Sequence, residues 1–124
     1  MSGRRSKELR SFRCAMEGIA GAVRSEGHVR FHLAATILVA AASAWLKATA
    51  TDWLWILTAV AAVWVAELFN TALERLVDLA SPGQHPLAKA AKDTAAGAVL
   101  VAALYAAAVG AIVLGPPLWD KCMG

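Results

Sequence analysis

The chain has 124 residues, of which 59% are hydrophobic and 17% are charged, and its formal net charge is +3. The length fits one domain, but the composition is too apolar for an ordinary soluble domain of this size. Seven of the twelve lysines and arginines lie in the first thirty residues, and a basic arm beside a membrane meets anionic lipid more often than nucleic acid. The sequence therefore predicts an all-α integral membrane protein that does not bind nucleic acid.

Residues 1–27 are expected to form a cytoplasmic arm and an interfacial helix. Apolar side chains recur there at spacings of three and four, with basic and acidic residues between them: Leu9, Phe12, Met16, Ile19 and Val23. This pattern is typical of an amphipathic helix that lies on a membrane surface. Gly27 and His28 predict a bend after it.

Residues 28–118 are expected to form a transmembrane domain of three spans, because a helix needs roughly 20 mostly apolar residues to cross a bilayer. The predicted spans are residues 28–48, 53–79 and 87–114. The Pro- and Gly-rich stretch 81–86 is the strongest break in the sequence. The stretch Gly115-Pro116-Pro117 is expected to end the third helix, which leaves 119–124 as a short external tail.

The distribution of basic residues gives the expected orientation. The N-terminal arm and the loop between the second and third spans hold most of the lysines and arginines, and such segments stay in the cytoplasm. The N-terminus is therefore predicted to be cytoplasmic and the C-terminus external. Three thin helices rich in alanine and glycine bury little surface alone and can approach one another closely, so a homo-oligomer is expected.

The second span carries a polar stripe where it leaves the membrane. Its members share one arc of about 80° on the helix surface at about 100° per residue: Glu67, Asn70, Glu74 and Asp78. Glu67 should lie about 9 Å inside the cytoplasmic boundary of the hydrocarbon layer. An intramembrane carboxylate costs roughly 2.5–3.5 kcal/mol and usually has a function.

Lys92 and Asp93 directly precede the charge-free run 94–118 of the third span, so they should lie at the same cytoplasmic level. This set suits phosphoryl transfer from ATP to an alcohol. Glu74 could offer an oxygen to Mg²⁺, Lys92 could neutralise phosphate, and Glu67 could act as the base. No Gly-rich phosphate loop of the P-loop kind is present.

Other interpretations stay open for these residues. Glu74 could simply be solvated where the helix leaves the membrane, Asn70 could hydrogen-bond a neighbouring helix, and His32 and His85 are interpreted as a packing residue and a loop residue. Two further function classes are a small proton-coupled transporter that uses Glu67 as its relay, and a non-catalytic membrane assembly subunit.

The stretch ELFNTALERLVDLASPGQHPLAKAAKDTAAGAVL, residues 67–100, resembles the prokaryotic diacylglycerol kinase family through its pattern E-x-x-N-[ST]-A-[IL]-E followed by D, H-x-L and A-K-D. The segment VRSEGHVRFH, residues 23–32, resembles the first-helix segment of that family, and the likeness covers about residues 10–114. It implies a small homotrimeric lipid kinase of the bacterial inner membrane, with active sites between subunits. The expected substrates are ATP and the primary hydroxyl of undecaprenol or diacylglycerol. The sequence of residues 81–99 is closer to the branch of the family that phosphorylates undecaprenol, which favours that lipid.

The resemblance also implies roles for individual residues. The catalytic positions are Glu67, the base, and Asn70, which orients the site. The positions that contact ATP are Glu74, which also binds Mg²⁺, Lys92 and Asp93 at the phosphates, and Gln84 and His85 on the adenine side. The positions near the lipid substrate are Glu26, Arg24 and Ala96. One position departs from the family, because Ala20 aligns with a second metal carboxylate that Glu17, one turn earlier, could replace.

Overall fold

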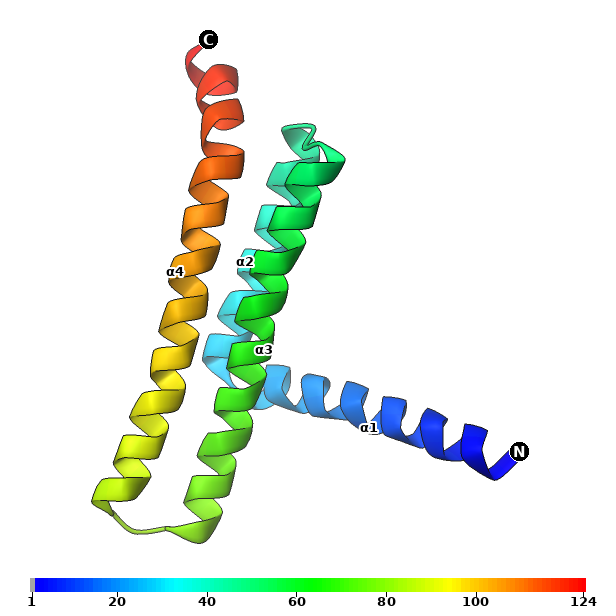
Figure 1. Ribbon diagram of the computed structural model, residues 1–124, viewed down its shortest axis with the longest axis vertical. Helices are drawn as coiled ribbons and strands as arrows, with labels where there is room; N and C mark the ends of the chain where they lie inside the picture. Colours follow the sequence, from blue (N-terminus) through cyan, green and yellow to red (C-terminus); the bar gives the residue numbers. More distant parts are fainter. Residues whose placement is uncertain (1) are drawn as a thin grey trace.

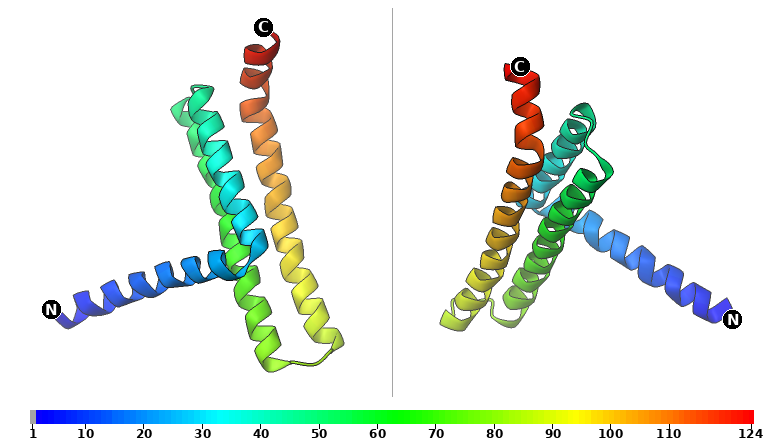
Figure 2. Two further views of the ribbon diagram at one scale, coloured as in Figure 1. Left: turned by 180° about the vertical axis from the view of Figure 1, so that it is seen from behind. Right: turned by 45° about the horizontal axis from the view of Figure 1, so that its top comes forward.

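The computed structural model describes residues 2–124, and within them the chain forms four α-helices and no strand (Figure 1). They are α1 (Ser2–Ser25), α2 (Gly27–Trp45), α3 (Ala50–Ala80) and α4 (Pro86–Met123). Helices α2, α3 and α4 run side by side, and α1 leaves this bundle at a steep angle (Figures 1 and 2). The prediction of an all-α protein is confirmed.

Judged by length and composition, α3 and α4 are long and apolar enough to cross a membrane. They correspond to the second and third predicted spans. Helix α2 is not one of these two helices. The first predicted span therefore stays a prediction.

Local side-chain contacts explain where α3 and α4 begin. Thr49 and Asp52 form a capping box at the start of α3, in which each side chain accepts a backbone N–H bond of 3.1 Å from the other residue. At the start of α4, His85 Nδ1 accepts the backbone N–H of Leu87 at 3.0 Å, and Pro86 occupies the first turn, where its missing N–H is tolerated.

The bend between α1 and α2 lies at Glu26, one residue before the predicted position. The guanidinium of Arg30 donates from Nη1 to the carbonyl oxygens of Val23 and Arg24, at 3.1 and 2.7 Å. These are among the last carbonyls of α1, which lack partners within the helix. The Nη2 atom of Arg75 on α3 donates to Ser25 Oγ at 2.7 Å. The end of α1 is thus bound to both α2 and α3.

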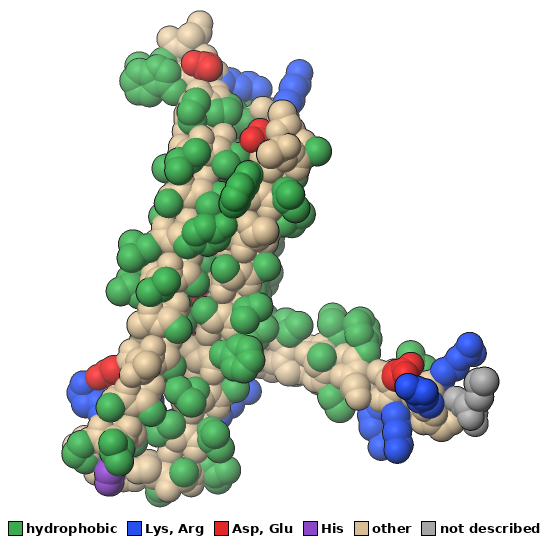
Figure 3. Space-filling view, in the orientation of Figure 1, with side chains coloured by type: hydrophobic (Ala, Val, Ile, Leu, Met, Phe, Trp, Pro, Cys, Tyr) green, Lys and Arg blue, Asp and Glu red, His purple; other side chains and the backbone are tan. Residues whose placement is uncertain are grey.

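Helix α1 exposes the apolar stripe that the sequence predicts. Leu9, Phe12, Met16 and Ile19 are all exposed, and Figure 3 shows hydrophobic side chains along one side of the helix with basic ones gathered toward its N-terminal end. A helix with these two faces is suited to lie in a membrane interface.

Packing within the chain is closest between α3 and α4. The buried apolar residues of α3 follow helical spacing and include Ile56, Ala59 and Val63. In contrast, α4 buries a single residue, Val109, and exposes many large apolar side chains (Figure 3). Such a surface needs lipid or further protein to cover it.

The prediction that Gly115-Pro116-Pro117 ends the third helix is wrong, because α4 continues through both prolines to Met123. Most of the expected tail, 119–124, is therefore helical. Proline removes helical hydrogen bonds and bends a helix, and Figure 2 shows α4 bending toward its C-terminal end. The end is held by Lys121, whose Nζ donates to Trp45 O at 3.2 Å and lies 4.4 Å from the centre of the Trp45 ring.

The contact between α2 and α3 includes a hydrogen bond that can be tested. Trp64 Nε1 donates to Thr36 Oγ1 at 2.9 Å, and such bonds between membrane helices contribute about 0.6 kcal/mol on average. Thr36→Val and Trp64→Phe should each lower the free energy of unfolding by about this amount, and the double variant should lose little more than Thr36→Val. Equilibrium unfolding in mixed micelles measures this, and fully additive losses would contradict the contact.

Candidate active site

The polar stripe of α3 becomes more exposed along the helix in the predicted order. Glu67 and Thr71 are each 2% exposed and Asn70 is 7% exposed, whereas Glu74 is half-buried and Asp78 is exposed. The buried end of the stripe lies toward the middle of α3, and the exposed end lies near the loop to α4. Glu67 is thus the carboxylate that the fold withdraws from the surface.

The two oxygens of Glu67 face two histidines of α2. Oε1 lies 2.9 Å from His32 Nε2, and Oε2 lies 3.3 Å from His28 Nε2. The interpretation of His32 as a packing residue is therefore wrong, since its ring faces a buried carboxylate. The sequence does show that His28 and His32 share one face of a helix, because they are four residues apart. It does not show that this face meets Glu67.

Three neighbouring polar atoms of α3 are buried without a hydrogen-bond partner in the described chain: Glu67 Oε2, Asn70 Oδ1 and Thr71 Oγ1. The contact of Oε2 with His28 lacks hydrogen-bond geometry. The amide of Asn70 is only loosely held, since its Nδ2 donates to Glu74 Oε1 at 3.4 Å. Buried polar groups in folded proteins nearly always have partners, so this cluster is suited to receive polar groups from outside the chain.

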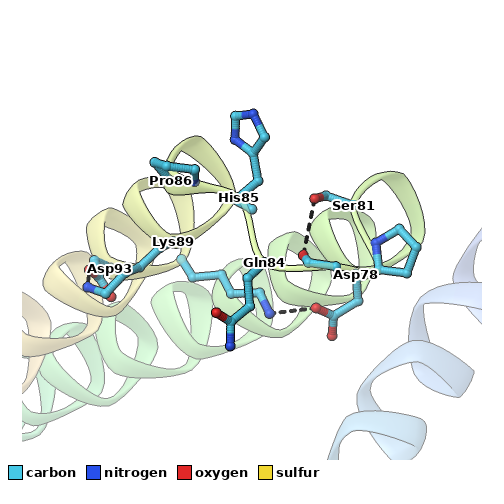
Figure 4. A pocket seen from close by; sticks show the side chains of 11 residues that line it. Asp78, Ser81, Gln84, His85, Pro86, Lys89 and Asp93 are labelled. Atoms are coloured by element: carbon cyan, nitrogen blue, oxygen red, sulfur yellow. Dashed lines mark hydrogen bonds and ion pairs between the residues drawn. The ribbon is translucent and has the colours of Figure 1, made fainter.

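A separate pocket of about 810 Å³ lies where α3, the loop 81–85 and α4 meet (Figure 4). Four of the residues expected to contact ATP line it: Gln84, His85, Lys92 and Asp93. In Figure 4 the side chains of Gln84 and Asp78 extend toward the same side of the loop, whereas the ring of His85 points toward the opposite side. Glu74 does not line this pocket.

Each charged residue expected at the phosphates already has a partner of opposite charge. Lys92 Nζ donates to Asp78 Oδ1 at 2.5 Å, which joins α4 to α3, and Lys89 Nζ donates to Asp93 Oδ2 at 2.5 Å within α4. The sequence reasoning assigned no site role to Asp78 or Lys89. The spacing of four residues between Lys89 and Asp93 on one helix predicts their ion pair. The pair of Lys92 with Asp78 depends on how α3 and α4 face each other, which the sequence does not show.

The residues expected near the lipid lie elsewhere in the fold. Glu26 is half-buried at the bend, where its Oε2 lies 3.9 Å from His28 Nδ1. Arg24 is exposed at the end of α1, and Ala96 is exposed on α4 one turn beyond Lys92.

The structure does not bring the two expected metal ligands together within one chain. Glu17 pairs with Arg13 on α1 at 3.1 Å, with its side chain 63% exposed, while Glu74 lies on α3. Within residues 2–124, no group of three or more His, Cys, Asp or Glu side chains is placed to hold a metal ion. A metal at Glu74 would need its other ligands from outside this chain.

Comparisons with known proteins show the family to which this chain belongs. The family model for prokaryotic diacylglycerol kinase matches residues 13–114. The undecaprenol kinase of Bacillus subtilis (strain 168) is 38% identical over 110 residues, which cover 89% of each chain. A diacylglycerol kinase of Synechocystis is 43% identical over 112 residues, which cover 89% of this chain and 63% of the relative. The diacylglycerol kinase of Escherichia coli K12 is 30% identical over 98 residues, which cover 79% of this chain and 80% of the relative. This chain belongs to the prokaryotic diacylglycerol kinase family.

Proposed function

We propose that this protein is an ATP- and Mg²⁺-dependent kinase that phosphorylates the primary hydroxyl of a membrane lipid alcohol. The observation that carries the proposal is a buried carboxylate with an unpartnered oxygen, Glu67 Oε2, on the helix that also borders a lysine-containing pocket. Relatives are named for phosphorylating undecaprenol and diacylglycerol. We favour undecaprenol, because the undecaprenol kinase matches this chain over 89% of both lengths.

Glu67 would act as the general base. It accepts the hydroxyl proton of the lipid while the lipid oxygen bonds to the γ-phosphorus of ATP and the bond from phosphorus to the ADP oxygen breaks. The products are the lipid phosphate and ADP, and the proton remains on Glu67. A lipid hydroxyl reaches this depth without leaving the membrane, which agrees with the position of Glu67 among apolar helices.

The pocket at the loop would bind the nucleotide. Lys92 and Lys89 would neutralise phosphate oxygens as point charges, and Gln84 and His85 would contact the adenine side. Both lysines would exchange contacts with Asp78 and Asp93 for contacts with ATP.

Glu74 fits a Mg²⁺ ligand, because Mg²⁺ is commonly held by one or two carboxylates together with substrate phosphates. Its neighbour Asn70 would orient its carboxylate through their 3.4 Å contact. The metal supplies neutralisation of phosphate charge. Glu17 of a neighbouring subunit is the candidate for a second carboxylate, in place of Ala20.

The assembly that this requires is a homotrimer in the bacterial inner membrane with α2, α3 and α4 as its spans. The N-terminus and the loop 81–85 would be cytoplasmic and the C-terminus external. The support is the exposed apolar surface of α4 and the cluster of unpartnered polar atoms on α3, since both are incomplete in a single chain.

Transfer of phosphate to lipid tests this proposal directly. The purified protein in detergent micelles, given ATP labelled at the γ-phosphate, should label undecaprenol and do so faster than diacylglycerol. Chelation of Mg²⁺ should abolish the label. A protein that labels neither lipid in the presence of Mg²⁺ is not a kinase of this type.

Glu67→Gln should lower kcat by about 10³-fold, because general bases contribute typically 10²–10⁴-fold and the amide keeps the shape without accepting the proton. The same phosphate-transfer assay measures this. Size-exclusion chromatography provides the control, in which the variant should elute as the parent does. Activity near that of the parent would remove Glu67 from the role of base.

Lys92→Met should raise the KM for ATP about tenfold, because hydrogen bonds to charged groups are worth roughly 1.5–3 kcal/mol. Lys121→Met is the matched control, since it removes a lysine at the opposite end of α4 and should leave this KM unchanged. Equal effects of the two substitutions would show that charge at Lys92 has no local role.

A further inference from the structure

The histidines of α2 differ in how they contact Glu67, and this difference suggests two separate tasks. We propose that His32 is a positioning residue that holds Glu67 through Oε1, and that His28 carries the transferred proton from Oε2 to the surface. This inference rests on the proposed function and deepens it, because it says what happens to the base before and after each transfer.

His32 has the features of a positioning residue. Its Nε2 lies 2.9 Å from Glu67 Oε1, and its side chain is 18% exposed. The ring also packs edge-on against Phe31, with ring centres 5.4 Å apart. An imidazole fixed in this way directs one oxygen of the carboxylate and leaves the other available for chemistry.

The available oxygen is Oε2, which is buried and has no hydrogen-bond partner in the described chain. Glu67 is enclosed, with a side chain only 3% exposed, so water does not reach it freely. A base in this position must lose its proton after each turnover to act again. The ionic contacts of Glu67 in residues 2–124 are His28 and His32, and neither lysine of the nucleotide pocket is among them.

His28 connects Oε2 to the surface. Its side chain is 41% exposed, Nε2 lies 3.3 Å from Glu67 Oε2, and Nδ1 lies 3.9 Å from Glu26 Oε2. A neutral ring with its proton on Nδ1 has an Nε2 that can accept another. A rotation of the exposed His28 ring that turns this 3.3 Å contact into a hydrogen bond lets the proton left on Glu67 by the lipid hydroxyl pass to Nε2, which regenerates the carboxylate. The Nδ1 proton leaves to water or to Glu26, which leaves a neutral ring with its proton on Nε2. Because the ring is 41% exposed, exchange with water then moves the proton back to Nδ1 and prepares His28 for the next turnover.

The test compares rescue of two alanine variants. His28→Ala and His32→Ala should each lower kcat by about 10²-fold, within the range of proton-transfer contributions, while the KM for ATP changes less than about twofold, since neither ring lines the nucleotide pocket. Imidazole added to the buffer should restore turnover of His28→Ala in proportion to its concentration, because that site is open to solvent. It should not restore His32→Ala.

Conservative variants separate the two tasks. His32→Gln should keep most of kcat, because an amide nitrogen can reach Oε1. His28→Gln should be as slow as His28→Ala, because an amide has no nitrogen that can take up a proton from Glu67 and release it again. These variants also test the inference if an alanine variant does not assemble. Thr36→Val is the matched control, one turn further along α2 without a contact to Glu67, and should keep kcat.

The outcomes distinguish this inference from the proposed function. An inactive Glu67→Gln beside fully active histidine variants would overturn the roles of both histidines and leave the base in place. A well-assembled His28→Ala that imidazole does not rescue, or an active His28→Gln, would overturn the proton path. An active Glu67→Gln would remove the base itself.

Discussion

The constraint on which the polar part of this structure depends is the burial of the Glu67 carboxylate among apolar helices. A carboxylate taken out of water needs partners or it destabilises the fold. The fold supplies two imidazoles from successive turns of α2, at 2.9 and 3.3 Å. This need explains why α2 carries two histidines in its first turns.

The arrangement separates two environments along α3. Toward its middle α3 buries Glu67, and at its end the helix borders a lysine-containing pocket. Under the proposed function, a lipid hydroxyl would enter at the first and the phosphates of ATP at the second. Helix α1, bound to α2 and α3 through Arg30 and Arg75, leaves the bundle near the level where these environments meet (Figure 1). All of these polar groups lie toward one end of the bundle, which favours transfer at one membrane surface over transport across the membrane.

The rise per residue of an α-helix was enough to predict from the sequence the order of several site residues along the helices. It placed Glu67 deeper than Glu74 and Asp78, and it placed Lys92 near the end of the stripe. It did not determine which helix faces Glu67, because rotation of α2 about its axis depends on packing, and His28 and His32 were therefore missed. The Lys92–Asp78 pair was missed for the same reason. Helix α4 continues through Pro116 and Pro117 to a distant contact of Lys121 with Trp45, which the local sequence pattern does not indicate.

The central claim is that Glu67 Oε2 receives the proton of a lipid hydroxyl beside bound ATP. The most direct measurement is an experimental structure of the assembled protein with Mg²⁺, a non-hydrolysable ATP analogue and a short-chain lipid alcohol. We expect the lipid hydroxyl oxygen to lie about 2.6–3.2 Å from Oε2. Oε1 should still contact His32, and the phosphates should contact Lys92. A lipid hydroxyl bound to another carboxylate, with Glu67 still enclosed by its histidines, would contradict it.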